Sequence, residues 1–250
     1  MKIQICSDLH LEFSKNREWL KHNPLVPKSE TLIIAGDTYY LERDYSKLDF
    51  INKISKDFKH VYLIPGNHEY YGGYNAATAL LSSQIEIKKN VHMLNNTSVQ
   101  IGDTNFIFST LWSKIEKHIN EIKMGMNDFR LIKFEEKRLT INDYNMIHNK
   151  AFDFISNEIK KEGKKVVITH HLPSEHCNAD EFKGSDLNEA FCVEKTEFIL
   201  NSNVDYWVYG HSHRNIDGFK IGNTNMITNQ FGYAEWDEHK AFDYEKVIEV

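Results

Sequence analysis

The stretch KIQICSDLH, residues 2–10, decides the fold, because an apolar run ends there directly before an acidic residue and a histidine. Residues 2–6 form a short apolar run next to polar residues, which indicates a β-strand. Four similar runs follow, at residues 31–35, 61–64, 166–169 and 206–209. Most lack polar alternation, so we expect strands buried on both faces in a sheet that helices cover. Buried helical segments are the alternative, which the shortness of the runs disfavours.

Each of the five predicted strands is followed by side chains of types that bind metals. In chain order these are Asp8 and His10, Asp37, Asn67 and His68, His170 and His171, and His211 and His213. The carboxyl ends of strands in α/β sheets lie along one edge, where ligands bind, so these side chains are expected to meet. Taken alone, each fragment has a simpler explanation, such as a helix cap at Asp8 or a turn at Gly36-Asp37. Five fragments in order favour a shared site.

The residue types indicate metal-dependent hydrolysis. In GHSH, residues 210–213, the two histidines lie two apart, so in extended backbone both can face one cavity. A mixture of imidazole, carboxylate and amide groups favours first-row transition metals, and the absence of cysteine among these groups argues against a structural zinc site. Two such ions about 4 Å apart neutralise a phosphoryl group and activate water. We therefore predict a phosphate ester hydrolase with two divalent transition-metal ions, manganese first and Fe, Zn or Ni as alternatives.

The rest of the chain alternates between strand and helix patterns. Residues 45–58 and 144–161 have the apolar spacing of amphipathic helices. Hairpins are predicted with turns at Gly102-Asp103 and Gly222-Asn223. The Lys- and Glu-rich segment at about 112–142 predicts a helical excursion and leaves open whether it covers the site. With no repeat or linker, we expect one α/β domain over residues 1–250.

Composition excludes several classes of protein. The net charge of -6 argues against a broad basic surface for nucleic acid, so nucleic-acid binding is not expected. No run approaches the roughly 18 apolar residues of a membrane helix, and the N-terminus lacks the pattern of a secretory signal. Cys6, Cys177 and Cys192 are odd in number and scattered, which favours a reducing compartment. We expect a cytoplasmic protein whose partner is a small-molecule phosphate ester; the oligomeric state is not indicated.

The ordered fragments resemble the signature of the calcineurin-like metallophosphoesterase superfamily. They read here as Asp8-Leu-His10, Gly36-Asp37, Gly66-Asn67-His68-Glu69, His170 and Gly210-His211-Ser-His213. The segments NDFR at 127–130, THHLPS at 169–174 and FGY at 231–233 resemble small bacterial and phage members. The resemblance implies a four-layer α/β/β/α sandwich of two mixed β-sheets flanked by helices, the metallo-dependent phosphatase fold.

The same resemblance implies a role for each residue of the signature. One metal would be held by Asp8, His10, Asp37 and His213, and the other by Asp37, Asn67, His170 and His211, with Asp37 as the bridge. His68 would act near the leaving group as an acid or hydrogen-bond donor, and Glu69 would orient its imidazole. Of the adjacent histidines, His170 would be the ligand, and His171 would lie behind the ligands or face the substrate.

Substrate contacts are less strongly indicated. Arg130, His171 and Arg214 are candidates, since guanidinium groups suit phosphate, with solvated surface charge as the alternative for the arginines. The chain departs from many relatives at Gln230-Phe231, where Pro-Arg is frequent, so one candidate phosphate-binding cation is missing. Monoester and diester substrates both stay open. The alternative functions are a nuclease of the same superfamily and a non-catalytic metal-dependent binding or scaffold module, against which His68 argues.

Overall fold

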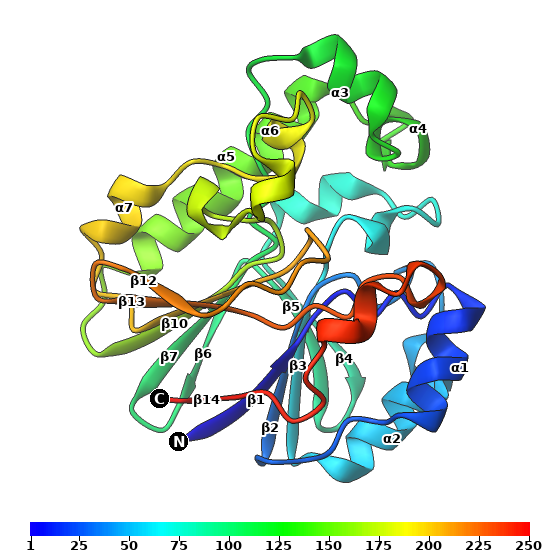
Figure 1. Ribbon diagram of the computed structural model, residues 1–250, viewed down its shortest axis with the longest axis vertical. Helices are drawn as coiled ribbons and strands as arrows, with labels where there is room; N and C mark the ends of the chain where they lie inside the picture. Colours follow the sequence, from blue (N-terminus) through cyan, green and yellow to red (C-terminus); the bar gives the residue numbers. More distant parts are fainter.

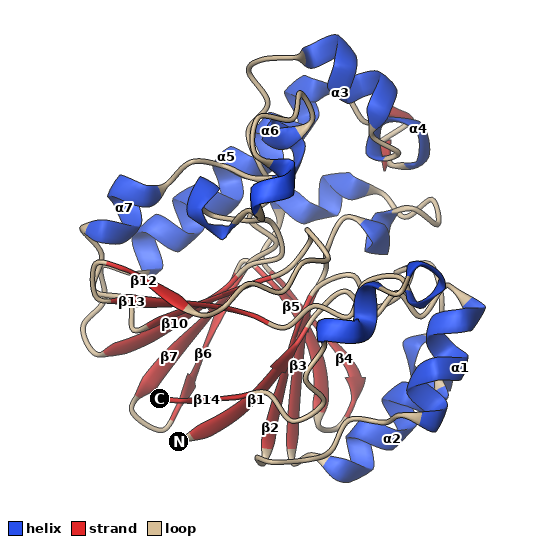
Figure 2. Ribbon diagram, viewed as in Figure 1, coloured by secondary structure: helices blue, strands red, loops and turns tan.

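The computed structural model describes residues 1–250, which form two six-stranded β-sheets packed against each other (Figure 2). The first sheet has the order β14 (Val247–Glu249), β1 (Lys2–Cys6), β2 (Thr31–Ala35), β3 (His60–Ile64), β5 (Val91–Asn95) and β4 (Ser83–Lys88). The second has the order β12 (Phe219–Ile221), β13 (Thr224–Thr228), β11 (Tyr206–Tyr209), β10 (Lys164–Ile168), β7 (Thr104–Phe108) and β6 (Thr97–Ile101). In both, the inner strands are parallel and the edge strands antiparallel.

The strands are apolar on both faces because both faces are covered. In β2, Ile33 and Ala35 point into the core between the two sheets, whereas Leu32 and Ile34 point into the core under the helices. The same alternation places Val166 and Ile168 of β10 between the sheets and Val167 under the other helical layer. The near-continuous apolar runs therefore reflect burial on both sides.

Helices cover the two outer faces and complete the four layers (Figure 1). The helices α1 (Ser14–His22) and α2 (Asp49–Asp57) cover the first sheet, and α5 (Ile141–Glu158) and α7 (Thr196–Leu200) cover the second. A shorter helix, α6 (Asn188–Phe191), precedes α7. The 3-10 helices are η1 (Tyr45–Lys47), η2 (His68–Tyr70), η3 (Ala76–Leu80), η4 (Glu175–Cys177), η5 (Asp180–Phe182), η6 (Ala234–Trp236) and η7 (Glu238–Ala241). The predicted α/β/β/α sandwich is confirmed.

The predicted elements differ from the observed ones mainly at their ends. The helix predicted over 45–58 divides into η1 and α2, because Leu48 between them adopts extended backbone. The helix predicted from residue 144 begins at Ile141, where Thr140 and Asp143 form a capping box that satisfies the first free N–H groups. Both hairpins are confirmed, with β6 paired to β7 across Gly102-Asp103 and β12 paired to β13 across Gly222-Asn223.

The segment at 112–142 is helical only in part. It contains α3 (Ile119–Gly125), α4 (Asp128–Leu131) and a two-stranded ribbon of β8 (Lys133–Phe134) and β9 (Lys137–Arg138). It lies at the top of the molecule in Figure 1 and packs through an apolar cluster of its own, which includes Trp112 and Tyr144. Leu111 and Trp112 both have positive φ, of 66° and 55°, where the chain leaves β7 and turns into this segment.

No helix of the structure combines the length and the apolarity that crossing a membrane requires. The two termini lie side by side at the opposite end of the sheets from the α3 and α4 segment (Figure 1). The N-terminal amino group donates a hydrogen bond to the carbonyl of Val250. The β14 strand thereby closes the edge of the first sheet against β1.

Candidate metal centre

All seven residues predicted as metal ligands meet at the carboxyl ends of the parallel strands. They come from the segments that follow β1, β2, β3, β10 and β11, so residues up to 205 positions apart in the chain converge there; the seven are Asp8, His10, Asp37, Asn67, His170, His211 and His213. Six of them are buried, and the side chain of His213 is 12% exposed. The convergence of these strand ends is what brings the dispersed fragments together.

The first group of donors consists of Asp8, His10, Asp37 and His213. The Nε2 atoms of His10 and His213 lie 2.9 Å apart. The Nε2 atom of His10 is 3.6 Å from Asp37 Oδ2, and that of His213 is 3.5 Å from Asp8 Oδ1. These four side chains surround a single point.

The second group consists of Asp37, His170 and His211, joined by the amide of Asn67. The Nε2 atom of His170 lies 3.3 Å from Asp37 Oδ1, 3.2 Å from Asn67 Oδ1 and 3.1 Å from His211 Nδ1. Asp37 therefore presents Oδ2 to the first group and Oδ1 to the second. This is the placement expected of a bridging carboxylate.

The protonation of the histidines makes both groups fit a cation. His10, His170 and His213 each direct Nδ1 at an acceptor: Glu12 at 3.0 Å, the carbonyl of Ala35 at 2.9 Å and Glu238 at 2.8 Å. Because those atoms are acceptors, each Nδ1 carries the hydrogen, and each neutral ring presents an Nε2 lone pair to the centre. Neighbouring ligands of an ion bound at about 2.1 Å lie about 3.0–3.4 Å apart, which is close to the observed spacings.

The electrostatics of the protein also favour positive charge at this point. Burial would lower the pKa of His170, but the carboxylate of Asp37 outweighs it and raises that pKa to about 10. Burial would likewise raise the pKa of Asp37, but His170 and His68 hold it well below its ordinary value. The bridging carboxylate is thus ionised, and it stabilises a positive charge beside it, such as that of a metal ion.

Five of the seven candidate ligands have left-handed backbone. The φ angles are 56° at Asp8, 45° at His10, 53° at Asp37, 77° at His211 and 54° at His213. This region is uncommon for residues other than glycine and costs free energy, so it persists where the surrounding structure enforces it, often at functional sites. The carboxylate of Asp8 helps to enforce it by accepting hydrogen bonds from the backbone N–H of His211 at 2.9 and 3.1 Å.

Two glycines permit the close approach of the ligand side chains. A Cβ atom at Gly66 would overlap the Oδ1 atom of Asp37 and would lie 2.7 Å from Nε2 of His170. A Cβ atom at Gly36, whose φ is 92°, would overlap the ring of His170. Neither neighbour can move away without leaving its donor group, so both positions require glycine.

Glu69 does not have the predicted role. Its carboxylate accepts hydrogen bonds from the backbone N–H groups of Asp37 at 3.0 Å, Thr38 at 2.7 Å and Gly66 at 2.6 Å, and from the hydroxyl of Tyr45 at 3.2 Å. It therefore ties the loop after β2 to the loop after β3 and does not orient the imidazole of His68. The prediction is wrong because unpaired backbone N–H groups at the two strand ends satisfy this buried carboxylate.

The ring of His68 lies at the edge of the two donor groups. Its backbone N–H donates to Asp37 Oδ1 at 3.0 Å, and its Nδ1 lies 2.8 Å from Glu12 Oε1. The Nε2 atom is 3.4 Å from the hydroxyl of Tyr233, and 12% of the side chain is exposed. Burial would lower the pKa of His68, but the carboxylates of Asp37 and Glu12 raise it to about 9. His68 can therefore carry a proton toward an oxygen at this edge.

Several residues of the site were not predicted from the sequence. Glu12 and Glu238 bind the Nδ1 atoms of two candidate ligands, Asp128 accepts from the amide of Asn67 at 2.9 Å, and Gln230 accepts from the backbone N–H of His213 at 2.6 Å. The alternation Asp8, His10, Glu12 was a usable signal. The segments NDFR and FGY contain Asp128 and Tyr233, so the motifs were visible although their contacts were not. Gln230 thereby supports the GHSH loop, whereas Phe231, at the position where the missing cation would stand, is buried in the core under the helices.

The three predicted substrate contacts are not supported. His171 is fully buried, stacks on Trp112 and lies 3.2 Å from the hydroxyl of Tyr144, so it packs behind the ligand His211 and does not face a substrate. Arg130 is exposed and donates to the carbonyls of Met124 and Gly125 at the end of α3. Neither residue reaches the donor groups because tertiary contacts hold its side chain elsewhere.

Arg214 lies closer to the centre but is already paired. Its guanidinium donates to the carboxylate of Glu181 and to that of Glu238 at 3.2 Å, and it stacks over Phe182. Glu238 in turn holds His213. Arg214 therefore supports the ring of a candidate ligand through Glu238, and its charge is compensated by two carboxylates.

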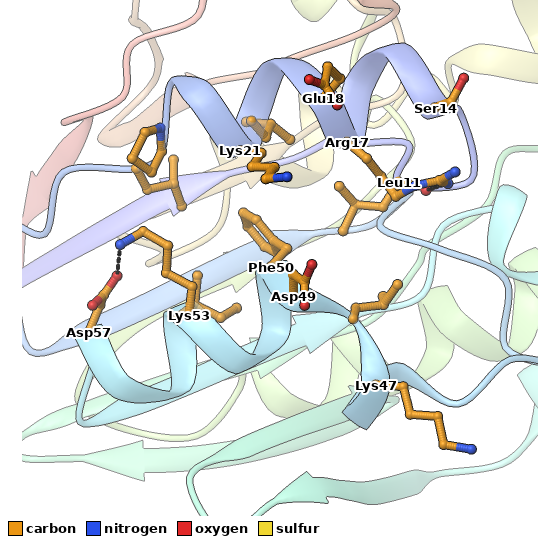
Figure 3. Close-up of a pocket in the computed structure, with 15 residues that line it drawn as sticks. Leu11, Ser14, Arg17, Glu18, Lys21, Lys47, Asp49, Phe50, Lys53 and Asp57 are labelled. Atoms are coloured by element: carbon orange, nitrogen blue, oxygen red, sulfur yellow. Dashed lines mark hydrogen bonds and ion pairs between the residues drawn. The ribbon is translucent and has the colours of Figure 1, made fainter.

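A concavity with a partly apolar lining is separate from the donor groups. It has a volume of about 510 Å³ and lies between α1 and α2 (Figure 3). Leucine, isoleucine and phenylalanine side chains form its floor, and Lys53 pairs with Asp57 at 3.0 Å on its rim. None of the predicted site residues lines it, although Arg17 connects it to the metal centre through the carbonyls of Leu11 and Glu12.

Comparison with known proteins agrees with the class that this fold and centre define. The family model for calcineurin-like phosphoesterases matches residues 1–215, so the chain belongs to the calcineurin-like phosphoesterase family. Members of this family depend on metal ions, and the protein is a metal-dependent phosphoric ester hydrolase.

Two relatives illustrate the range of the similarity. An uncharacterized protein of Acanthamoeba polyphaga mimivirus is 31% identical, over 93% of this chain and 91% of that protein. The crystal structure of a phosphopantetheinyl hydrolase from Mycobacterium tuberculosis superposes with a TM-score of 0.68 at 15% identity, over 99% of this chain and 95% of that one. The second likeness establishes the fold and does not identify a substrate.

Proposed function

We propose that this protein hydrolyses a phosphomonoester or phosphodiester of a small molecule or nucleotide at a centre of two divalent metal ions. The observation that carries the proposal is the position of Asp37, which offers one carboxylate oxygen to each of two donor groups. The ligands in this proposal are Asp8, His10, Asp37 and His213 for one ion and Asp37, Asn67, His170 and His211 for the other. When bound, two such ions neutralise charge on a phosphoryl group and activate a water nucleophile.

The residues of the chain contribute three things to this reaction. The buried aspartates and histidines fix the donor geometry, because carboxylates and a carbonyl hold the opposite nitrogen of three of the rings. Burial keeps bulk water from competing for the donors. His68 supplies the proton: with Nδ1 on Glu12, its Nε2 atom is free to donate to the leaving oxygen.

A small substrate fits the charges around the centre better than a polynucleotide. Arg214 is compensated by two carboxylates and Arg130 by backbone carbonyls, and the net charge of the chain is -6. Neither arginine is therefore free to bind the phosphates of a nucleic-acid backbone, which disfavours the nuclease alternative. The position of His68 disfavours a non-catalytic scaffold, which has no use for a proton donor.

Aromatic side chains at the rim support an ester with a flat apolar group. Tyr233 packs on the rings of His10 and His213, with centroids 4.6 and 4.5 Å apart. Phe13 and Trp236 flank Tyr233 at 5.2 and 5.1 Å and are 42% and 69% exposed. Exposed aromatic surface beside a catalytic centre suits stacking of a nucleobase or aryl group.

The experiment that tests the proposal measures turnover and metal content together. Purified protein is assayed with para-nitrophenyl phosphate, its diester and a set of nucleotides, each with Mn, Ni, Zn, Fe or Mg. We expect activity with a first-row transition metal, Mn first, loss on chelation, and two ions per chain by mass analysis. Full activity in a metal-free preparation, or a single ion per chain at saturation, would contradict the two-metal mechanism.

Two broader features belong to the same proposal. We propose that residues 1–250 act as a single domain, because segments following strands of both sheets supply the donors. We also propose a cytoplasmic location, which is supported by the three cysteines, all buried and free of disulfides. Labelling of the unfolded protein with a thiol reagent tests the absence of disulfides on which the second proposal rests, with three reactive thiols expected.

A further inference from the structure

Glu12 lies between a candidate metal ligand and the proposed proton donor. Its Oε1 atom is 3.0 Å from Nδ1 of His10 and 2.8 Å from Nδ1 of His68. The two imidazole rings meet edge to face, with centroids 4.5 Å apart. One carboxylate oxygen, on a side chain that is 3% exposed, therefore binds both rings.

We propose that Glu12 is a positioning residue that fixes the tautomer and orientation of His68 for proton donation, and that it does so through the oxygen that also holds His10. The inference rests on the proposed function. It adds a coupling between metal binding and leaving-group protonation that neither the ligand set nor His68 alone provides.

The hydrogen bonds determine which nitrogen of His68 meets the substrate. An ionised carboxylate only accepts, so the Nδ1 atoms of His10 and His68 both carry hydrogen. Nε2 of His10 then faces the first donor group, and Nε2 of His68 faces the rim beside the hydroxyl of Tyr233. The ring of Tyr71, with its centroid 4.1 Å away, packs against the ring of His68. His68 is thereby aimed with Nε2 toward the edge where a leaving group departs.

No other carboxylate of the site performs this task. Glu12 is the only one paired with the ring of His68. Asp37 accepts the backbone N–H of His68, Glu69 is occupied by backbone N–H groups of the two loops, and Asp128 accepts from Asn67 and the hydroxyl of Tyr71. Removal of the Glu12 carboxylate would leave the ring of His68 without a partner for Nδ1.

The backbone beneath Glu12 is held rigidly. Arg17 lies at the edge of the cavity between α1 and α2 (Figure 3). Its guanidinium donates to the carbonyls of Leu11 and Glu12. On the other side, the N–H of Leu11 donates to the carbonyl of Thr38 at 2.9 Å. The second oxygen of Glu12 is buried and makes no hydrogen bond to another group of the protein.

The step that Glu12 supports is a balanced hydrolysis. The bond between phosphorus and the leaving oxygen breaks, and the leaving oxygen takes the proton from Nε2 of His68. Water adds its hydroxyl group to phosphorus and releases its other proton, which returns to His68 through solvent. The products are the phosphate and the free alcohol. An acid matters more as the leaving oxygen becomes more basic, so the role of Glu12 is measurable through the leaving group.

Glu238 provides a matched control. Like Glu12, it binds Nδ1 of a histidine in the first donor group, here His213 at 2.8 Å, but it has no hydrogen bond to His68. The variants Glu12→Gln and Glu238→Gln both remove a carboxylate from behind a candidate ligand. An effect that acts only through metal affinity would therefore appear in both, whereas an effect through His68 would appear in Glu12→Gln alone.

The experiment compares phenyl esters carrying nitro, chloro or no substituent, at saturating Mn and with bound metal measured. We expect Glu12→Gln to lower kcat on the order of 100-fold for unsubstituted phenyl but only about 10-fold or less for nitrophenyl. His68→Ala should show the same dependence, and the double variant should be no slower than His68→Ala. Glu238→Gln should keep the wild-type dependence on the leaving group while requiring more metal.

The inference is overturned if Glu12→Gln and Glu238→Gln have the same leaving-group dependence, or if the losses in the double variant multiply. A measurement on the wild-type protein tests the inference even if a variant does not fold. Nitrogen-15 NMR of the zinc-loaded protein should find hydrogen on Nδ1 of His68, and a bare Nδ1 would overturn the inference. Inactivity of the wild type toward every ester would instead count against the proposed function, and the NMR result would still decide the role of Glu12.

Discussion

At the scale of single residues, the centre depends on which atom each side chain presents. His10, His170 and His213 direct Nε2 inward because an acceptor holds each Nδ1, and His211 directs Nδ1 inward, where it lies 3.1 Å from Nε2 of His170. Asp37 serves both groups with its two oxygens. Individual substitutions should therefore separate binding from proton transfer.

Replacing Asp37 by asparagine should remove nearly all activity. The amide keeps the shape but loses the charge that both ions share, so metal affinity and turnover should each fall by more than about 100-fold, beyond the roughly 10- to 100-fold cost of losing an outer partner. Metal titration with a turnover assay measures this. Asp44→Asn, at an exposed carboxylate that caps η1, is the control and should behave as the wild type.

Replacing His68 by alanine should lower turnover and spare metal content. The ring belongs to a third cluster, with His10 and Glu12, and to neither of the two donor groups that share Asp37. Two ions should therefore still bind, while loss of the proton donor reduces kcat on the order of 100-fold or more. Mass analysis and steady-state kinetics on the same preparation provide the measurement. His60→Ala, at the exposed start of β3, is the matched control. Equal loss of metal and activity in His68→Ala would mean that His68 acts as a ligand.

At the scale of elements, the loops after the strands carry the site and the strands position it. The loops after β2 and β3 are joined by Glu69, which accepts hydrogen bonds from N–H groups in both. The left-handed backbone of the candidate ligands lies after β1, β2 and β11, at Asp8, His10, Asp37, His211 and His213. The excursion between β7 and α5 contributes Asp128, which holds the amide of Asn67. The predicted excursion thus takes part in the site through one buried side chain.

Gly66→Ala should disable the loop after β3. Its Cβ atom would overlap Asp37 Oδ1, and the displaced carboxylate would lose contact with the donors, so activity should fall by more than about 100-fold. Kinetics with metal titration test this. Gly73→Ala is the control in the same loop: its φ of 99° makes alanine strained, but the space is open, so it should cost roughly 1 kcal/mol of stability and keep activity. Normal metal binding by Gly66→Ala would contradict the steric argument.

At the scale of the whole molecule, the packing of the two six-stranded sheets brings donors from both sheets into a single centre. The core between the sheets contains Ile33 from one and Val166 from the other, and the donors lie at its rim. Buried carboxylates and histidines at this rim make the metal-free protein sensitive to pH, since folding changes their proton affinities.

The metal-free protein should be most stable near pH 6.5. Burial lowers the pKa of His10, His171 and His211 below the ordinary value of 6.5. Below pH 6.5 the unfolded chain therefore binds more protons at these histidines than the folded protein does, so the stability of the folded protein rises as the pH approaches 6.5. The pKa of His68 is raised to about 9 and that of His170 to about 10, so their contribution is complete below pH 6.5 and is lost as pH rises through 9 and 10. Thermal unfolding at a series of pH values, with chelator, measures this profile.

The loaded protein provides the comparison for that profile. Bound metal replaces the proton on His170 and favours the folded state by mass action, so the decline above pH 6.5 should become smaller with saturating metal. The variant His68→Ala should show a smaller decline without metal. A metal-free stability that rises steadily to pH 10 would show that these two histidines do not contribute as described.

Local sequence patterns were enough to predict the fold class and the candidate donors. Apolar runs of strand length, each followed by an acid, amide or histidine, specified parallel strands and therefore a common edge, because the period and the position of polar residues are local properties. The boundaries of helices at Leu48 and Thr140 were missed, since extended backbone and a capping box decided them.

The groups that hold the donors from behind could not be predicted in this way, because they come from other parts of the folded chain. Glu12, Asp128 and Glu238 bind side chains from other segments, and Glu69 binds backbone N–H groups at two strand ends instead of its neighbour His68. Hydrogen bonds of this kind depend on the distances between loops, and left-handed residues set the paths of those loops. The spacing of residues along the chain does not predict these distances. For the same reason, the sequence nominated Arg130 and His171, whose side chains are held elsewhere by their local packing.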